Sequence, residues 1–166
     1  GEVAGDGRER QGRVRRRRAL WIALAVNGGF FLAEEYGPSL LKVTADGLVS
    51  ERWVATGNQA RMQHAELIVR DVLPVTIARR RLNRGLEALC ASADGRWLYL
   101  GLQSAPAGED ERSAPIWKLD ADTGALAGEW RYPFDAPETF RRDAARRRVG
   151  AGDLKVCEFA WTGEDR

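Results

Sequence analysis

Two adjacent carboxylates, Glu34 and Glu35, stand directly before a Tyr36-Gly37-Pro38 turn. Neighbouring residues on a strand point to opposite faces of a sheet, so only one of the two faces a given site unless a bulge intervenes. Carboxylates at a strand end can bind a metal ion or act as a general acid and base. A charged strand end beside a turn is the alternative interpretation.

The segment 79–87 places four arginines, Asn83 and Glu87 directly before or at the start of an apolar run. If Glu87 lies inside the protein, its charge needs a cation or a metal ion as partner. Arg81 and Arg84 are the nearest cations in the sequence. A functional site and a salt bridge that locks the start of the strand explain this pattern equally well.

Gln103 and Ser104 close an apolar run that corresponds, in the repeat described below, to the run ending at the two carboxylates. Polar side chains at corresponding strand ends are typical of a shared polar rim, and also of ordinary strand ends. His64 is the only histidine, and no Ser or Asp spacing around it indicates a catalytic triad. We expect it to be a solvated loop residue.

A long repeat sets the framework for these residues. The glycines of three turn dipeptides, Asn27-Gly28, Asp94-Gly95 and Thr162-Gly163, lie 67 and then 68 residues apart, each after a mostly apolar run. The Gly47 to Trp53 spacing recurs between Gly124 and Trp130. A unit of this length holds roughly four strands of about five or six residues, which is what one propeller blade needs.

The predicted fold is therefore all-β: about two and a half four-stranded antiparallel blades of an incomplete β-propeller. The units span 19–56, 86–132 and 154–166, the last with a strand over Leu154–Trp161 and its turn. In the insertion 57–84, Pro74 allows one short helix within 73–81, and a helical turn is expected around 137–147. The predicted strands are 19–26, 29–35, 39–44, 48–55, 86–92, 97–103, 114–120 and 126–132.

Charge and composition exclude some classes of protein. The 26 basic and 24 acidic residues nearly balance, so no overall field indicates nucleic acid, and aromatic residues are not interleaved with the arginine clusters. Residues 1–18 form a basic segment that we expect to be disordered. The apolar run 19–26 follows four arginines like a signal peptide, but Asn27-Gly28 favours a strand, and the run is too short to span a bilayer. Cys90 and Cys157 are expected to be buried thiols in equivalent strands, too far apart for a disulfide.

These residues together resemble a known family. The motifs Gly29–Leu41, Leu73-Pro74, Arg79–Leu89, Asp94–Tyr99 and Leu102–Ser104 are similar, in order and spacing, to the phytase-like domain of bacterial proteins, also called the esterase-like activity of phytase family. The similarity runs from about Leu20 to the end of the chain. It implies a β-propeller that is usually exported, here to the periplasm or the medium, with acidic residues linked to hydrolysis of phosphoesters or other esters.

The resemblance also assigns residues. Its motif positions fall on Glu35, Arg81, Asn83, Arg84, Glu87 and Gln103. The chain departs from the family pattern at Glu34, where Asp is common, and at Leu86 and Ala88, where Phe and Gly are common. With a central site drawing on several blades, we expect the remaining blades to lie in the same polypeptide and the isolated fragment to be inactive.

Two functional hypotheses follow. In the first, the chain is part of a phytase-like hydrolase in which Glu35 and Glu87 are catalytic, Glu34, Glu35 and Glu87 hold Ca²⁺ or another divalent cation, and Arg81, Asn83, Arg84 and Gln103 bind a small ester or phosphoester. In the second, the propeller is not catalytic and binds a ligand or a partner protein through its rim loops. Neither hypothesis involves nucleic acid or a transmembrane segment.

Overall fold

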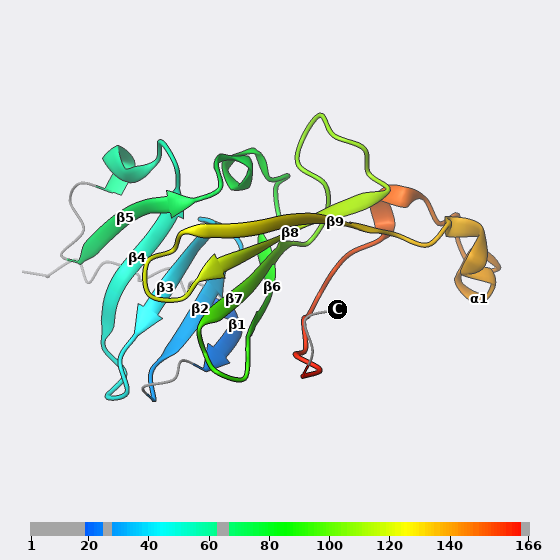
Figure 1. Cartoon of the computed structure of the whole chain (residues 1–166). Coiled ribbons are helices and arrows are strands. Elements are labelled where there is room, and N and C mark those ends of the chain that lie inside the picture. The colour runs from blue at the N-terminus through cyan, green and yellow to red at the C-terminus, as the bar shows by residue number, and fades with distance from the viewer. Residues whose placement is uncertain (1–18, 25–27, 63–66, 164–166) are drawn as a thin grey trace, which may run out of the picture.

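The computed structural model describes residues 19–24, 28–62 and 67–163, which form two sheets with little helix (Figure 1). The first sheet has the order β1 (Ala19–Leu24), β2 (Phe30–Glu34), β3 (Ser39–Val43), β4 (Val49–Ala55) and β5 (Ile68–Leu73). The second has the order β6 (Leu86–Ala91), β7 (Trp97–Leu102), β8 (Ser113–Asp120) and β9 (Leu126–Pro133). The all-β class and the eight strands predicted in the first two units are confirmed to within a few residues.

The short connections follow from local turn chemistry. Gly28 and Gly95 have positive φ values of 74° and 65°, which glycine adopts without the steric cost that other residues incur. At the second turn the carboxylate of Asp94 accepts hydrogen bonds from the Ser92 hydroxyl and from the backbone N–H of Arg96. Gly28 therefore lies in the connection of the hairpin β1–β2, and Asp94-Gly95 forms the turn of the hairpin β6–β7.

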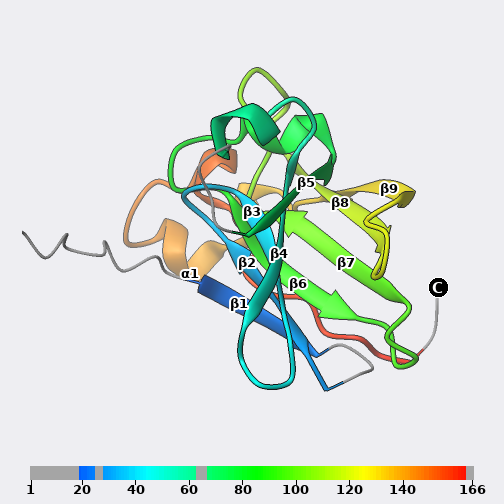
Figure 2. The same ribbon diagram turned by 90° about the vertical axis from the view of Figure 1, so that its left-hand side faces the viewer.

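The two sheets are offset copies of one another. Where β1 pairs with β2, a residue is skipped between Ala19 and Trp21, and where β6 pairs with β7 a residue is skipped between Leu86 and Ala88, 67 positions later. The strands β6, β1 and β2 lie next to one another. This is the arrangement of consecutive propeller blades, and within the described residues the two blades do not close into a ring (Figure 2).

A large apolar core fills the space between the sheets. Trp53 from β4 and Trp117 from β8 are fully buried there, and the ring of Phe31 lies 5.4 Å from that of Trp53. A smaller cluster on the other face of the second sheet contains Ala88, Ala114 and Val156.

The insertion between the units differs from the prediction. It contains β5, which pairs in parallel with the outer strand β4 and was not predicted. β5 is joined to β4 through the bond from Thr56 N to Leu73 O at 2.9 Å, and Leu73 is fully buried. The predicted short helix is present as a 3-10 helix, Val75–Arg79, directly after Pro74, and its Ile77 side chain enters the core. Another 3-10 helix spans Gln59–Met62.

The strand predicted over Leu154–Trp161 does not form. This segment lies against the end of β7 through one backbone bond, from Val156 N to Gln103 O at 2.9 Å, and no neighbouring strand in the described residues completes a ladder with it. Its side chains still pack on the second sheet: Phe159 lies over Gly101 and Trp161 stacks on Tyr99. The segment thus follows the face of the sheet without belonging to it (Figure 2).

The remaining segments are short. The helical turn expected near 137–147 is present as a 3-10 helix, Pro137–Thr139, followed by α1 (Arg141–Ala144), and a last 3-10 helix spans Ala151–Asp153. No helix of the described chain is long and apolar enough to cross a membrane. The predicted disordered segment 1–18 and His64 lie outside the described residues.

The cysteine prediction is correct in part. Cys90 and Cys157 are not bonded to each other, and Cys90 lies half-buried on β6, where burial raises the pKa of its thiol. Cys157 is exposed, contrary to the prediction, because the segment that carries it is not inserted into a sheet.

Candidate functional site

A bulge in β6 sets the position of Glu87. Leu86 pairs with Leu102 and Ala88 pairs with Gly101, so Glu87 is the extra residue between two regular pairs. Leu86 belongs to the core between the sheets and Ala88 to the cluster on the opposite face. A bulge commonly redirects a side chain beside a functional site, and here it places a carboxylate at the edge of an apolar strand.

Glu35 reaches the same place from the first sheet. Gly85, two residues before Glu87, lies so close to the backbone of Glu35 that a Cβ at position 85 would collide with the Glu35 carbonyl. Arg80 holds this backbone from the other side, because its Nε donates to Glu35 O at 3.3 Å and its terminal nitrogen donates to Tyr36 O. The end of β2 is thereby fixed against the beginning of β6.

Gln103 completes the group. Its backbone N donates to Gly85 O at 3.0 Å, and its side-chain amide donates to the Glu87 carboxylate. Gln103 is only 5% exposed and its Oε1 has no hydrogen-bond partner in the described structure; the buried hydroxyl of Ser104 also has none. Buried polar atoms without partners are uncommon, so this corner is suited to a polar ligand or to water.

The charges of the group act on one another. Burial raises the pKa of Glu87 above its usual value, and the negative charge of Glu35 raises it further. The Gln103 amide, Lys155 and Arg84 act in the opposite direction. The arrangement can therefore supply one carboxyl that retains a proton more readily than usual, beside a second carboxylate.

Glu34 does not join this group. It is buried on the other side of the chain, where it forms an ion pair with Arg52 at 3.0 Å and accepts a hydrogen bond from the Ser39 hydroxyl. Along the described chain, no three His, Cys, Asp or Glu side chains converge as a metal site would require. The metal-binding role predicted for Glu34, Glu35 and Glu87 stays a prediction.

The residues predicted to bind substrate are placed in different ways. Arg81 forms an ion pair with Glu111, and Arg84 donates to the carbonyl oxygens of Gly152 at 2.7 Å and Leu154 at 3.4 Å. Asn83 is exposed, with a φ of 56° that marks the turn into β6. The structure thus brings Glu35, Glu87 and Gln103 together, with Arg84 beside them, and gives the two arginines structural partners.

Lys155 was missed by the sequence interpretation. Its charge acts on Glu87 because the segment that carries it is tied to the site on both sides, by Leu154 O to Arg84 and by Val156 N to Gln103 O. The sequence signal was present, since Lys155 is one of only three lysines in an arginine-rich chain.

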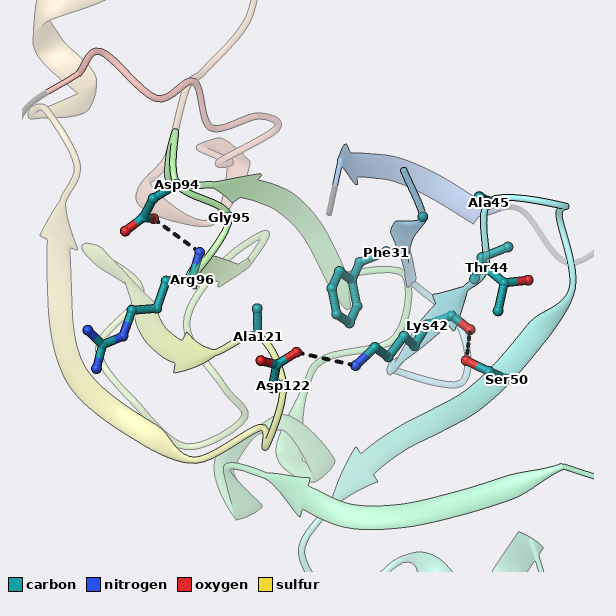
Figure 3. A pocket seen from close by; sticks show the side chains of 12 residues that line it. Phe31, Lys42, Thr44, Ala45, Ser50, Asp94, Gly95, Arg96, Ala121 and Asp122 are labelled. Carbon is teal, nitrogen blue, oxygen red and sulfur yellow. Dashed lines mark hydrogen bonds and ion pairs between the residues drawn. The ribbon is translucent and has the colours of Figure 1, made fainter. Parts of the chain in front are cut away.

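A cavity lies away from Glu35 and Glu87, at the opposite ends of the strands. Its volume is about 450 Å³, and it opens between the two sheets beside the ring of Phe31. Figure 3 shows Lys42 and Asp122 pointing toward one another across it, with an ion pair of 3.8 Å. None of the residues predicted for the site lines this cavity, so the cavity is separate from the site formed by Glu35, Glu87 and Gln103.

Comparison with known proteins gives one result. The model of the family described as "Phytase-like: Esterase-like activity of phytase" matches residues 22–166. No match is found among curated proteins or among solved structures.

Proposed function

Because the chain belongs to the phytase-like family, described as having the esterase-like activity of phytase, we propose that it carries part of a hydrolytic site for phosphoesters or other esters. The site is centred on Glu35 and Glu87. The observation that supports this most is the position of the two carboxyl groups beside the buried, unpartnered atoms of Gln103 and Ser104, as far as the described chain shows.

General acid and base catalysis suits these residues. In ester hydrolysis the oxygen of water bonds to phosphorus or to the acyl carbon, the ester bond breaks, and the leaving oxygen takes up a proton. Glu87 supplies that proton, because its raised pKa favours the protonated form. Glu35 accepts the proton that the attacking water loses, and the Gln103 amide keeps Glu87 in place.

A divalent cation is a separate proposal. The carboxylates of Glu35 and Glu87 and the free Oε1 of Gln103 are hard oxygen donors of the kind that Ca²⁺ binds. Ca²⁺ takes about six to eight such ligands, and the described residues offer fewer. The steps above use protein residues alone, and the assay below measures any dependence on Ca²⁺.

One observation favours the alternative, a propeller that binds without turnover. Arg81 and Arg84, the residues expected to grip a phosphate, already have partners. Under this hypothesis Glu35, Glu87 and Gln103 would bind a polar ligand, which would be released unchanged.

The test is hydrolysis by the protein at its full natural length. The substrates are p-nitrophenyl phosphate and p-nitrophenyl acetate, each measured with added Ca²⁺ and with a chelator. Glu35→Gln and Glu87→Gln are each expected to lower kcat by about 10² or more, as is typical for the loss of a general acid or base. Glu129→Gln, at an exposed position of β9, is the matched control. Unchanged rates in both site variants would overturn the proposal, and ligand binding without turnover in the wild type would favour the alternative.

A further inference from the structure

The arginines of the segment 79–84, which lie nearest to Glu35 and Glu87, all form hydrogen bonds or ion pairs with other parts of the protein. Arg79 and Arg81 form ion pairs with Glu109 and Glu111. Arg80 is bonded to the backbone of the Glu35-Tyr36 turn, and Arg84 to two backbone carbonyls of the segment 152–154. An anionic substrate would have to break one of these contacts to bind an arginine of 79–84.

Lys155 is differently placed. It is exposed, and it makes no hydrogen bond or ion pair with any described residue. Its two neighbours are fixed: the Leu154 carbonyl is bound by Arg84, and the Val156 N–H donates to Gln103 O at 2.9 Å. The Val156 side chain is buried against Ala88 and Ala114, so the backbone that carries Lys155 is anchored from both sides.

The two residues that hold the backbone on either side of Lys155, Gln103 and Arg84, lie beside Glu87. Gln103, whose carbonyl holds Val156, also donates its side-chain amide to Glu87. Arg84, which holds Leu154, lies three residues before Glu87 in the chain and close enough for its charge to act on Glu87, as the charge of Lys155 does. A free ammonium group is thereby held near the proton-bearing carboxyl.

We propose that Lys155 binds the anionic group of the substrate beside Glu87, so that the site prefers phosphate monoesters to uncharged esters. The proposal rests on the proposed hydrolytic function, which it makes more specific by naming the substrate class. A lysine ammonium is a common partner of phosphate. Arg80 and Arg84 then fix the backbone of the site, and Arg79 and Arg81 stay paired with Glu109 and Glu111, so that none of the four contacts the substrate.

The first experiment measures binding independently of turnover. Isothermal titration of the full-length protein with inorganic phosphate is expected to show binding that Lys155→Met weakens about tenfold or more, because one hydrogen bond between charged groups is lost. Lys155→Arg should retain most of the affinity. Lys118→Met is the matched control, since Lys118 lies on β8 over the rings of Trp97 and Tyr99.

The second experiment measures selectivity. In the hydrolysis assay, Lys155→Met should raise KM for p-nitrophenyl phosphate by a similar factor and change KM for the uncharged p-nitrophenyl acetate much less. Equal phosphate affinity in the wild type and in Lys155→Met, or no phosphate binding in either, would overturn the inference. Lys155-dependent phosphate binding without hydrolysis would support the inference while removing the proposed catalysis, so the two failures are distinguishable. The melting temperature of each variant checks that it is folded.

Discussion

The side-chain amide of Gln103 donates to the carboxylate of Glu87, while its carbonyl oxygen Oε1 stays buried without a partner among the described residues. This contact joins the bulge of β6 to the end of β7. By the register of the two sheets, Gln103 occupies the position that Glu35 occupies in the first sheet. Two equivalent strand ends thus meet at one site, one supplying a carboxylate and the other the amide that orients a second carboxylate.

The first prediction concerns the dependence of stability on pH. Because burial and Glu35 raise the pKa of Glu87 above its ordinary value of 4.5, the folded state binds more protons than the unfolded state between the two pKa values. The free energy of unfolding should therefore fall as pH rises through this interval, which begins near pH 4.5. Glu87→Gln should lose this part of the pH dependence.

Urea denaturation at a series of pH values, from about 4.5 upward, measures the effect. The control is Glu129→Gln, which should keep the slope of the wild type. A Glu87→Gln profile parallel to that of the wild type would show that Glu87 titrates normally.

The second prediction concerns Gly85. A methyl group at this position would collide with the carbonyl of Glu35, so Gly85→Ala should destabilise the fold by about 1–3 kcal/mol through overpacking. Gly37→Ala is the control, since Gly37 has open space around the corresponding Cβ and no positive φ. Denaturant midpoints of the two variants provide the comparison, and equal midpoints would contradict the close contact between β2 and β6.

Much of this arrangement was accessible from the sequence. The turn dipeptides Asn27-Gly28 and Asp94-Gly95 predicted the hairpins. The spacings of 67 and 68 residues between the turn glycines predicted a series of similar units. The resemblance to the family pointed to Glu35, Glu87 and Gln103, which the structure brings together. Local patterns suffice in such cases because a hairpin is formed by residues close in the chain.

The missed features depend on contacts between distant residues. β5 lies in a long insertion and pairs with β4 in parallel. A parallel pair has no tight turn between its strands, so no turn dipeptide in the sequence predicts it. The contact between Glu34 and Arg52 was also missed, because the two residues lie 18 positions apart, on β2 and β4. The strand predicted over Leu154–Trp161 has the right composition, but a strand also needs a neighbour, and composition does not supply one.

The third prediction concerns the buried pair of Glu34 and Arg52, whose side chains are 6% and 9% exposed. Glu34→Gln removes the negative charge that lies 3.0 Å from the buried Arg52 guanidinium and should cost about 3–5 kcal/mol. The double variant Glu34→Met with Arg52→Met should be less destabilised than the single one, because the guanidinium is removed together with the carboxylate. Thermal and urea unfolding of both variants measure this order, and the opposite order would show that the pair stabilises the sheet beyond its own desolvation cost.

The fourth prediction concerns Arg84. Since its guanidinium holds the carbonyls of Gly152 and Leu154, Arg84→Met should loosen the segment that carries Val156. Amide hydrogen exchange at Val156, which donates to Gln103 O, should become faster, while exchange in the central strands β3 and β8 stays as in the wild type. An unchanged rate at Val156 would mean that the apolar contacts of the segment hold it without the arginine.

The last prediction compares two tryptophans at equivalent positions. Trp53 pairs with Leu40 and Trp130 pairs with Ile116, and the registers of the two sheets make these pairs counterparts. Trp53 is fully buried because its face of the first sheet packs on the second sheet, whereas Trp130 is 51% exposed because the corresponding face of the second sheet is only partly covered. Trp53→Ala should cost about 3–5 kcal/mol through the cavity it leaves, and Trp130→Ala less than about 1 kcal/mol in this chain. Urea unfolding of the 166-residue chain decides the matter, because a loss above about 2 kcal/mol for Trp130→Ala would require that further residues cover its ring.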